Sequence, residues 1–144
     1  MSTNLYDTDH AAWLAQQAEL IRSGRLALVD QENLIEELES EMGNYRHQIK
    51  NRLRILLAHL LKWKYQPDQR SSSWRGTIRN QRQGIESVLE DNPSLRQTVA
   101  AAVEKAYPPA VRIAADDTGF KTSEFPKACE WSENEILDED FWPD

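Results

Sequence analysis

The sequence lacks several features that mark common classes of protein. It has one cysteine, Cys129, so no disulfide can form within the chain. Its longest apolar run, Ile55 to Leu61, is interrupted by His59 and is far shorter than the roughly 20 residues that a membrane span needs. No basic stretch leads into an apolar segment at the N-terminus, as it would in a secretory signal. We therefore expect a cytoplasmic protein that does not act in a membrane.

Motifs for common chemistry are also missing. The five glycines are scattered, so neither Gly-rich phosphate-binding motif is present. The three histidines, His10, His47 and His59, lack the spacing of a zinc site, and the Glu-x-x-His pairs of di-iron helical proteins do not occur. The residues therefore identify no reaction and imply no cofactor, and a non-catalytic protein is favoured over an enzyme.

Hydrophobic periodicity predicts an all-α fold. Along the 144 residues, apolar positions recur at steps of three or four, and no stretch alternates as a strand would. We expect a single helical domain, 1–144, built as a bundle in which a long central helix over about 31–64 forms a hairpin with a helix over 74–90. A kink is expected at Gly43-Asn44, and a break or bend at Pro108-Pro109 in a later helix.

The same periodicity marks helix ends and assigns side chains to the core. Gly24 ends a first helix over about 9–23, Asn92-Pro93 opens the helix that follows 74–90, and Ser132 with Glu135 caps a short terminal helix. In the first helix, the positions expected to be buried are Trp13, Leu14, Ala18 and Ile21. In the long helix, apolar positions recur from Ile35, Leu38 and Met42 onward, and a helix of this length must kink, protrude or meet a partner.

An ordered series of short motifs accompanies these helices. The series comprises Glu36-Glu37, Leu60-Leu61-Lys62-Trp63 leading to Gln66-Pro67, Ser73-Trp74 with Thr77-Ile78 and Arg82, and Pro93-Ser94-Leu95. It resembles the bacterial family called domain of unknown function 29, from about Tyr6 to Pro143. The resemblance implies a small helical protein and carries no activity over to any residue. Pro108-Pro109 departs from the family pattern, which tends to continue helically there.

Charge is unevenly distributed along the chain. The net charge of -7 comes from 17 basic and 24 acidic residues. The C-terminal tail, 130–144, holds seven acids and no base, and the segment 30–41 holds six acids and no base. Between residues 46 and 82 there are ten bases and one acid, a local charge of +9. An acidic protein therefore contains a strongly basic region.

This basic region supplies the candidate binding site. Arg75, Arg79 and Arg82 recur at i, i+4 and i+7, so they form one stripe on the 74–90 helix. Aromatic rings beside arginines can stack nucleic-acid bases. The candidate binding residues are Arg75, Arg79, Arg82, His59, Lys62, Trp63 and Trp74. The competing interpretation has core tryptophans, a solvated arginine face and a half-buried, hydrogen-bonded His59.

Glu36 and Glu37 are candidate metal ligands in one alternative only. Glu32, Glu36 and Glu39 line one face of the predicted long helix, and carboxylates on facing helices can hold a divalent ion. The helix dipole also favours acids near a helix N-terminus, which explains these residues without a metal.

Three partners compete to neutralise the basic region. The acidic tail can fold back over the hairpin; two copies can pair antiparallel with acidic segment against basic segment; or a nucleic acid can bind. The first hypothesis is a non-catalytic helical interaction protein, a homodimer or the partner of another protein, that associates through the 31–90 hairpin. The alternative is a nucleic-acid-binding protein or metal-assisted hydrolase that uses the basic 46–82 surface and is masked by the tail.

Overall fold

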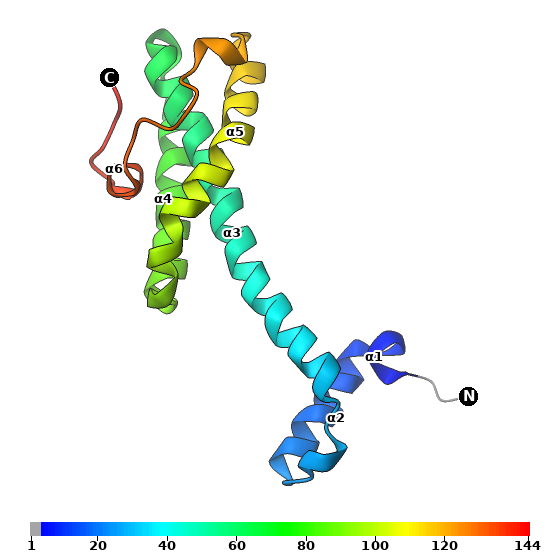
Figure 1. Cartoon of the computed structure of the whole chain (residues 1–144). Helices are drawn as coiled ribbons and strands as arrows, with labels where there is room; N and C mark the ends of the chain where they lie inside the picture. Colours follow the sequence, from blue (N-terminus) through cyan, green and yellow to red (C-terminus); the bar gives the residue numbers. More distant parts are fainter. Residues whose placement is uncertain (1–3) are drawn as a thin grey trace. The chain divides into compact units, whose positions relative to one another are not determined.

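The computed structural model describes residues 4–144 and is built from helices (Figure 1). Helices account for 79% of the structure, and none of the described residues forms a strand, which confirms the all-α prediction. The chain divides into two compact units, residues up to Gly43 and residues from Asn44 onward, and each is described by itself. The elements are α1 (Leu5–Thr8), α2 (His10–Arg22), η1 (Leu26–Leu28), α3 (Gln31–Tyr65), η2 (Pro67–Gln69), α4 (Ser72–Asp91), η3 (Pro93–Thr98), α5 (Val99–Thr118), η4 (Thr122–Glu124) and α6 (Glu133–Leu137).

The first unit is a helical pair with a very small core. Asp9 caps α2, because its carboxylate accepts a hydrogen bond from the Ala12 amide at 3.0 Å. Trp13 is buried and donates from its indole to Asp30 at 3.2 Å, while the Asp30 amide donates to Gln17 at 2.7 Å. These contacts attach α2 to the start of α3. Among residues 4–43, Trp13 and Gln17 are the buried side chains.

Several positions predicted to lie in the core of this unit are exposed. Leu14 and Ala18 on α2 are exposed, and so is Ile21 one turn further on. On α3, the periodic apolar residues Ile35, Leu38 and Met42 are each more than half exposed. The physical reason is that a pair of helices buries only the side chains along its one line of contact, and the other helices of residues 4–43, the four-residue α1 and the three-residue η1, are too short to cover the rest.

The long helix predicted over 31–64 is confirmed as α3, Gln31–Tyr65. Gly43 and Asn44, the expected site of a kink, keep helical conformation. The two units divide between these residues. A glycine inside a helix costs up to about 1 kcal/mol relative to alanine, so α3 is locally weakest where the units meet.

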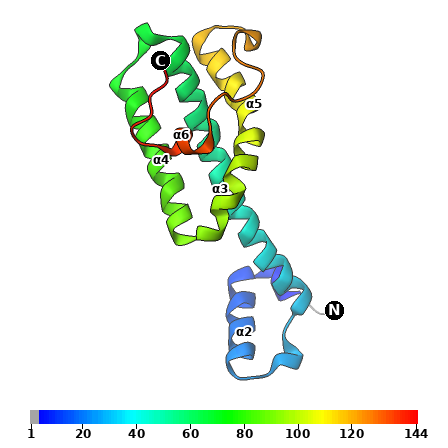
Figure 2. The same cartoon turned by 60° about the vertical axis from the view of Figure 1, so that its left-hand side comes forward.

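The second unit holds the main core. The C-terminal half of α3 lies beside α4 and α5 in both views (Figures 1 and 2). Leu53, Leu56, Leu57 and Leu60 are fully buried there. Ser71 caps α4 by accepting from the Trp74 amide at 3.2 Å. Gly84 leaves room for the Arg52 side chain, which donates to Gln81 at 3.2 Å and fixes α4 against α3.

Two of the remaining helix predictions are corrected: Asn92-Pro93 opens the 3-10 helix η3, so α5 begins only at Val99, and the paired prolines lie inside α5. The expected break at Pro108-Pro109 is wrong, because α5 continues through both residues to Thr118. The missing backbone donors weaken this helix, but Tyr107 and Ala110 on either side are buried and hold it in place. Gly119 ends α5 in the left-handed conformation, with φ of 77°. The predicted capping box of Ser132 and Glu135 begins α6.

Candidate functional site

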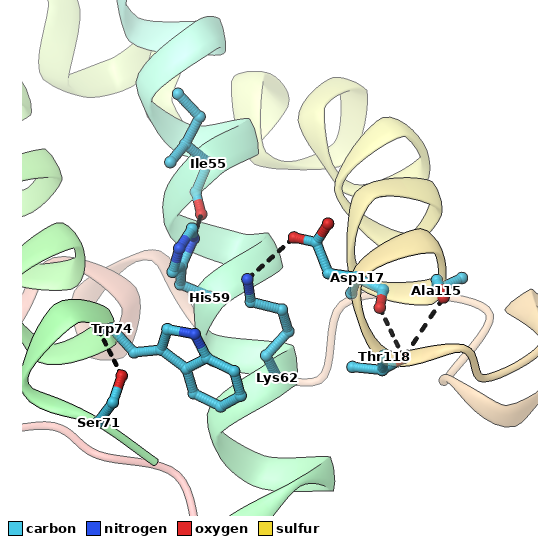
Figure 3. Close-up of polar contacts among 9 residues, drawn as sticks. Ile55, His59, Lys62, Ser71, Trp74, Ala115, Asp117 and Thr118 are labelled. Atoms are coloured by element: carbon cyan, nitrogen blue, oxygen red, sulfur yellow. Dashed lines mark hydrogen bonds and ion pairs between the residues drawn. The ribbon is translucent and has the colours of Figure 1, made fainter. Parts of the chain in front are cut away.

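Lys62 lies at the centre of a polar cluster at the closed end of the α3–α4 hairpin. Its side chain is buried, yet its ammonium group reaches Asp117 of α5 at 2.9 Å. The same ammonium lies 5.0 Å from the centre of the Trp74 ring, on the side opposite Asp117 (Figure 3). An ion pair and a cation–π contact therefore both satisfy the buried charge. Lys62 and Trp74, both candidate binding residues, contact each other.

His59 lies one turn before Lys62 and is held by its own helix. Its Nδ1 lies 2.9 Å from the Ile55 carbonyl oxygen, which can only accept, so Nδ1 carries the proton (Figure 3). Burial lowers the pKa of His59, and the nearby Lys62 charge lowers it further. The half-buried, hydrogen-bonded His59 of the competing interpretation is therefore confirmed.

The arginine stripe on α4 contacts aromatic rings, although Arg75 and Arg79 remain exposed. Arg75 and Arg70 place their guanidinium carbons 5.5 and 5.0 Å from the centre of the Trp63 ring. Arg79 and Arg82 lie 5.9 and 5.5 Å from the centre of the Trp142 ring, which belongs to the C-terminal tail. The two tryptophan rings are 4.7 Å apart. Their contacts tie the tail to the hairpin.

Arg82 is the anchor of the tail and is only 1% exposed. Its Nε donates to the Ile136 carbonyl and its Nη2 to the Phe141 carbonyl, both at 2.8 Å. Arg70 donates to the Pro143 carbonyl at 3.3 Å. The tail thus packs on the basic hairpin through its backbone and Trp142. Between the tail's carboxylates and this basic region, the described residues show one ion pair, Lys64 to Glu130 at 3.7 Å.

The two candidate metal ligands lie in the first unit and are not brought to a common centre. Glu37 accepts from the Tyr6 hydroxyl at 2.7 Å and from His10 at 2.8 Å. These hydrogen bonds lower the pKa of Glu37 and raise the pKa of Tyr6 to about 12. Glu36 is exposed. Nowhere within residues 4–144 do three His, Cys, Asp or Glu side chains gather as a metal site would require.

A hollow of about 420 Å³ lies between α5 and the segment before α6. Glu104, Lys127 and Cys129 are among the residues that line it. The Cys129 thiol donates to the Trp131 carbonyl at 3.5 Å, and burial raises its pKa. The raised pKa disfavours the thiolate form that a nucleophilic cysteine needs.

The feature that sequence reasoning missed is an apolar surface on the first unit. Seven large hydrophobic side chains are between 43% and 65% exposed, and all of them lie between residues 14 and 42. They are Leu14, Ile21, Leu26, Leu28, Ile35, Leu38 and Met42. We call this set the apolar surface. Their helical spacing was visible in the sequence, but spacing alone does not distinguish a covered stripe from an uncovered one.

The net charge coincides with the apolar surface. Residues 1–43 contain nine acids and two bases, a net charge of -7, whereas residues 44–144 contain 15 of each and are neutral. The first unit thus carries the whole net charge of the protein together with its exposed large hydrophobic side chains.

Fold, charge and the engaged side chains together define a small all-α protein with an exposed apolar, acidic unit and a closed helical core. No helix of the described chain is long and apolar enough to cross a membrane. The chain belongs to the family described as Domain of unknown function DUF29, whose match covers residues 5–142. Neither the curated proteins nor the solved structures contain a match to it.

Proposed function

We propose that this protein is a non-catalytic helical interaction protein that binds another polypeptide chain through the apolar surface of residues 14–42. One observation carries the proposal: every exposed large hydrophobic side chain of residues 4–144 lies in this one stretch. Single exposed hydrophobic residues are common, but a gathered set marks an interaction site.

The energy available from this surface is that of a specific complex. Burying a large aliphatic side chain fully contributes about 1.5–3 kcal/mol, and these seven are about half exposed. Covering them therefore contributes roughly 1 kcal/mol each, or about 7 kcal/mol in all. A micromolar complex has a binding free energy of about 8 kcal/mol, so polar contacts must supply the rest and offset the entropy of association.

Part of the basic 46–82 surface, the other candidate site, is already occupied by contacts within the chain, and this supports the proposal. Arg82 is buried on two carbonyl groups, Lys62 is paired with Asp117, and Arg79 packs against Trp142. A nucleic acid would have to displace the tail before it could reach Arg82, whereas Arg75 and Arg79 are exposed. The twofold homodimer, the bacterial origin and the cytoplasmic location stay predictions from the sequence; the half-buried thiol of Cys129 supports the last of these.

The test compares the wild-type chain with Ile35→Gln/Leu38→Gln/Met42→Gln. Glutamine keeps the helix propensity of α3 and removes three exposed hydrophobic groups. Both proteins are used to select binders from a displayed library of random peptides, and both are sedimented over a range of concentrations. We expect peptide binding or self-association that the triple variant loses.

The matched control is Asn80→Gln/Ser87→Gln/Glu90→Gln, which changes three exposed positions on α4. It should behave like the wild type in both measurements. If peptide binding and self-association are absent, or are equal in all three proteins, the apolar surface does not bind polypeptides and the proposal is wrong.

A further inference from the structure

The apolar surface contains two stripes, one on each helix of the first unit. On α2, Leu14 and Ile21 lie seven residues apart with Ala18 between them, and all three are exposed. On α3, Ile35, Leu38 and Met42 follow the same spacing of three and four. Residues at such spacing share one helical face, so each stripe is a continuous ridge.

The two stripes lie on the same side of the pair. His10 contacts Glu37 and Trp13 contacts Asp30, so α2 and the start of α3 run antiparallel. At about 100° per residue, the α2 stripe lies about 100° around its helix from the buried Trp13–Gln17 line. The α3 stripe lies about 125° around its helix from the Asp30–Glu37 line that contacts α2. Because the helices run in opposite directions, these turns bring both stripes to one face.

A row of carboxylates borders this face. Glu32, Glu36 and Glu39 are exposed on α3 at i, i+4 and i+7, and the helical turn places them alongside the stripe of Ile35, Leu38 and Met42. With -7 on residues 1–43, this face is apolar, and carboxylates follow the edge of the α3 stripe that lies away from α2. The matching ligand is apolar on one side and basic beside it.

We propose that this face binds a basic amphipathic helix of another protein, which completes a three-helix bundle with α2 and the start of α3. A helix is the expected form because two parallel ridges of helical side chains accept a third helix between them. The partner's hydrophobic residues would cover both stripes, and Lys or Arg residues on its flank nearer α3 would extend across the α3 stripe toward Glu32, Glu36 and Glu39. This inference rests on the proposed function and specifies the chemistry of the partner.

A second copy of this chain is less complementary. Its own first unit offers hydrophobic side chains but sets -7 against -7. Its basic segment, 46–54, offers positive charge, but the apolar residues along that segment, such as Ile49 and Leu53, are fully buried. Neither part of a second copy supplies exposed hydrophobic groups and positive charge together, whereas a basic amphipathic helix does.

The experiment uses the full chain and three synthetic peptides of about 18 residues, five turns of helix. The first peptide carries Leu on one face and Lys beside it; the second replaces every Lys with Glu; the third keeps Lys and replaces every Leu with Ser. Dissociation constants are measured by titration calorimetry at low and high salt. The Leu/Lys peptide should bind at least tenfold more tightly than either of the others, and salt should weaken its binding.

Charge reversal makes the test specific. The variant Glu32→Lys/Glu36→Lys/Glu39→Lys should bind the Leu/Lys peptide at least tenfold more weakly than the wild type, and it should bind the Leu/Glu peptide more tightly. The control reversal, Glu90→Lys/Asp91→Lys/Glu104→Lys, changes three exposed acids of the second unit and should leave both affinities unchanged. Circular dichroism and intrinsic tryptophan fluorescence check that each variant is folded.

The outcomes separate this inference from the proposed function. Equal binding of the Leu/Lys and Leu/Glu peptides, lost in Ile35→Gln/Leu38→Gln/Met42→Gln, overturns the basic partner but keeps a polypeptide-binding surface. Self-association that depends on the same residues, and that the peptides do not disrupt, also overturns it in favour of a second copy. Equal binding of the Lys/Ser peptide reveals charge attraction alone and overturns it too. If neither peptide binding nor self-association depends on these residues, both proposals are overturned.

Discussion

Arg82 is the most buried charged side chain of the described residues, and its replacement by methionine should destabilise the protein by loosening the tail. Methionine keeps much of the volume of the arginine stem but removes the guanidinium group. In the native protein this group satisfies the Ile136 and Phe141 carbonyls, each at 2.8 Å. It also packs beneath the Trp142 ring.

The magnitude follows from these contacts. A hydrogen bond from a charged donor contributes about 1.5–3 kcal/mol, and Arg82 makes two to carbonyl groups. Removing a buried charge gives part of this back, because burial disfavours the charged form and lowers the pKa of Arg82. We therefore expect the free energy of unfolding to fall by about 2–4 kcal/mol.

The assay is denaturant unfolding followed by circular dichroism, with hydrogen exchange of the amides from Ile136 to Phe141 as a local probe. The control is Arg79→Met, since Arg79 is exposed and lies against the same ring at 5.9 Å. That variant should lose less than about 1 kcal/mol. Equal losses in the two variants, or unchanged exchange at the tail in Arg82→Met, would refute the anchoring role of Arg82.

Three further predictions concern the hairpin. Asp117→Asn should destabilise the protein by about 1–3 kcal/mol because it leaves the Lys62 ammonium buried without a counter-charge, and Lys62→Met should remove most of that penalty in a double-mutant cycle of unfolding free energies. Burial lowers the pKa of His59 below 6.5, so the folded protein binds the His59 proton less readily than the unfolded chain does. The free energy of unfolding should therefore be highest above pH 6.5 and decrease as the pH falls below it. Urea unfolding midpoints measured across this pH range should show a smaller decrease for His59→Gln. Trp142→Ala removes the ring that lies against the Arg79 guanidinium. If the protein is an interaction protein, this variant should not bind a labelled single-stranded oligonucleotide better than the wild type in an electrophoretic mobility assay. A salt-sensitive gain in binding would favour the nucleic-acid alternative.

Local features of the fold could be predicted from the sequence because neighbouring residues determine them. The long α3, the serine cap of α4, Gly119 at the end of α5 and the capping box of α6 all follow from local chemistry. The break expected at the paired prolines was wrong because tertiary packing, not local chemistry, determined the structure there. Their local preference is against a helix, and burial of their neighbours overrode it.

The candidate site was only partly visible from the sequence. The arginine stripe and its aromatic neighbours do lie together, but the sequence could not show that Trp142, 60 residues after Arg82, covers them. The i, i+4, i+7 spacing identified Arg82 as part of a surface stripe, whereas the structure buries it on two carbonyls. Long-range packing of the tail therefore decided the role of the basic region.

The sequence by itself determined which residues form helices, which face of each helix is apolar, and where charge accumulates. Only the tertiary structure decided which apolar faces are covered. Ile49 and Leu53 are buried because α4 and α5 pack over that part of α3, while Ile35 and Leu38 carry the same periodic signal and stay exposed. Periodicity is a property of one segment, but burial depends on a second segment arriving from elsewhere in the chain or from another molecule.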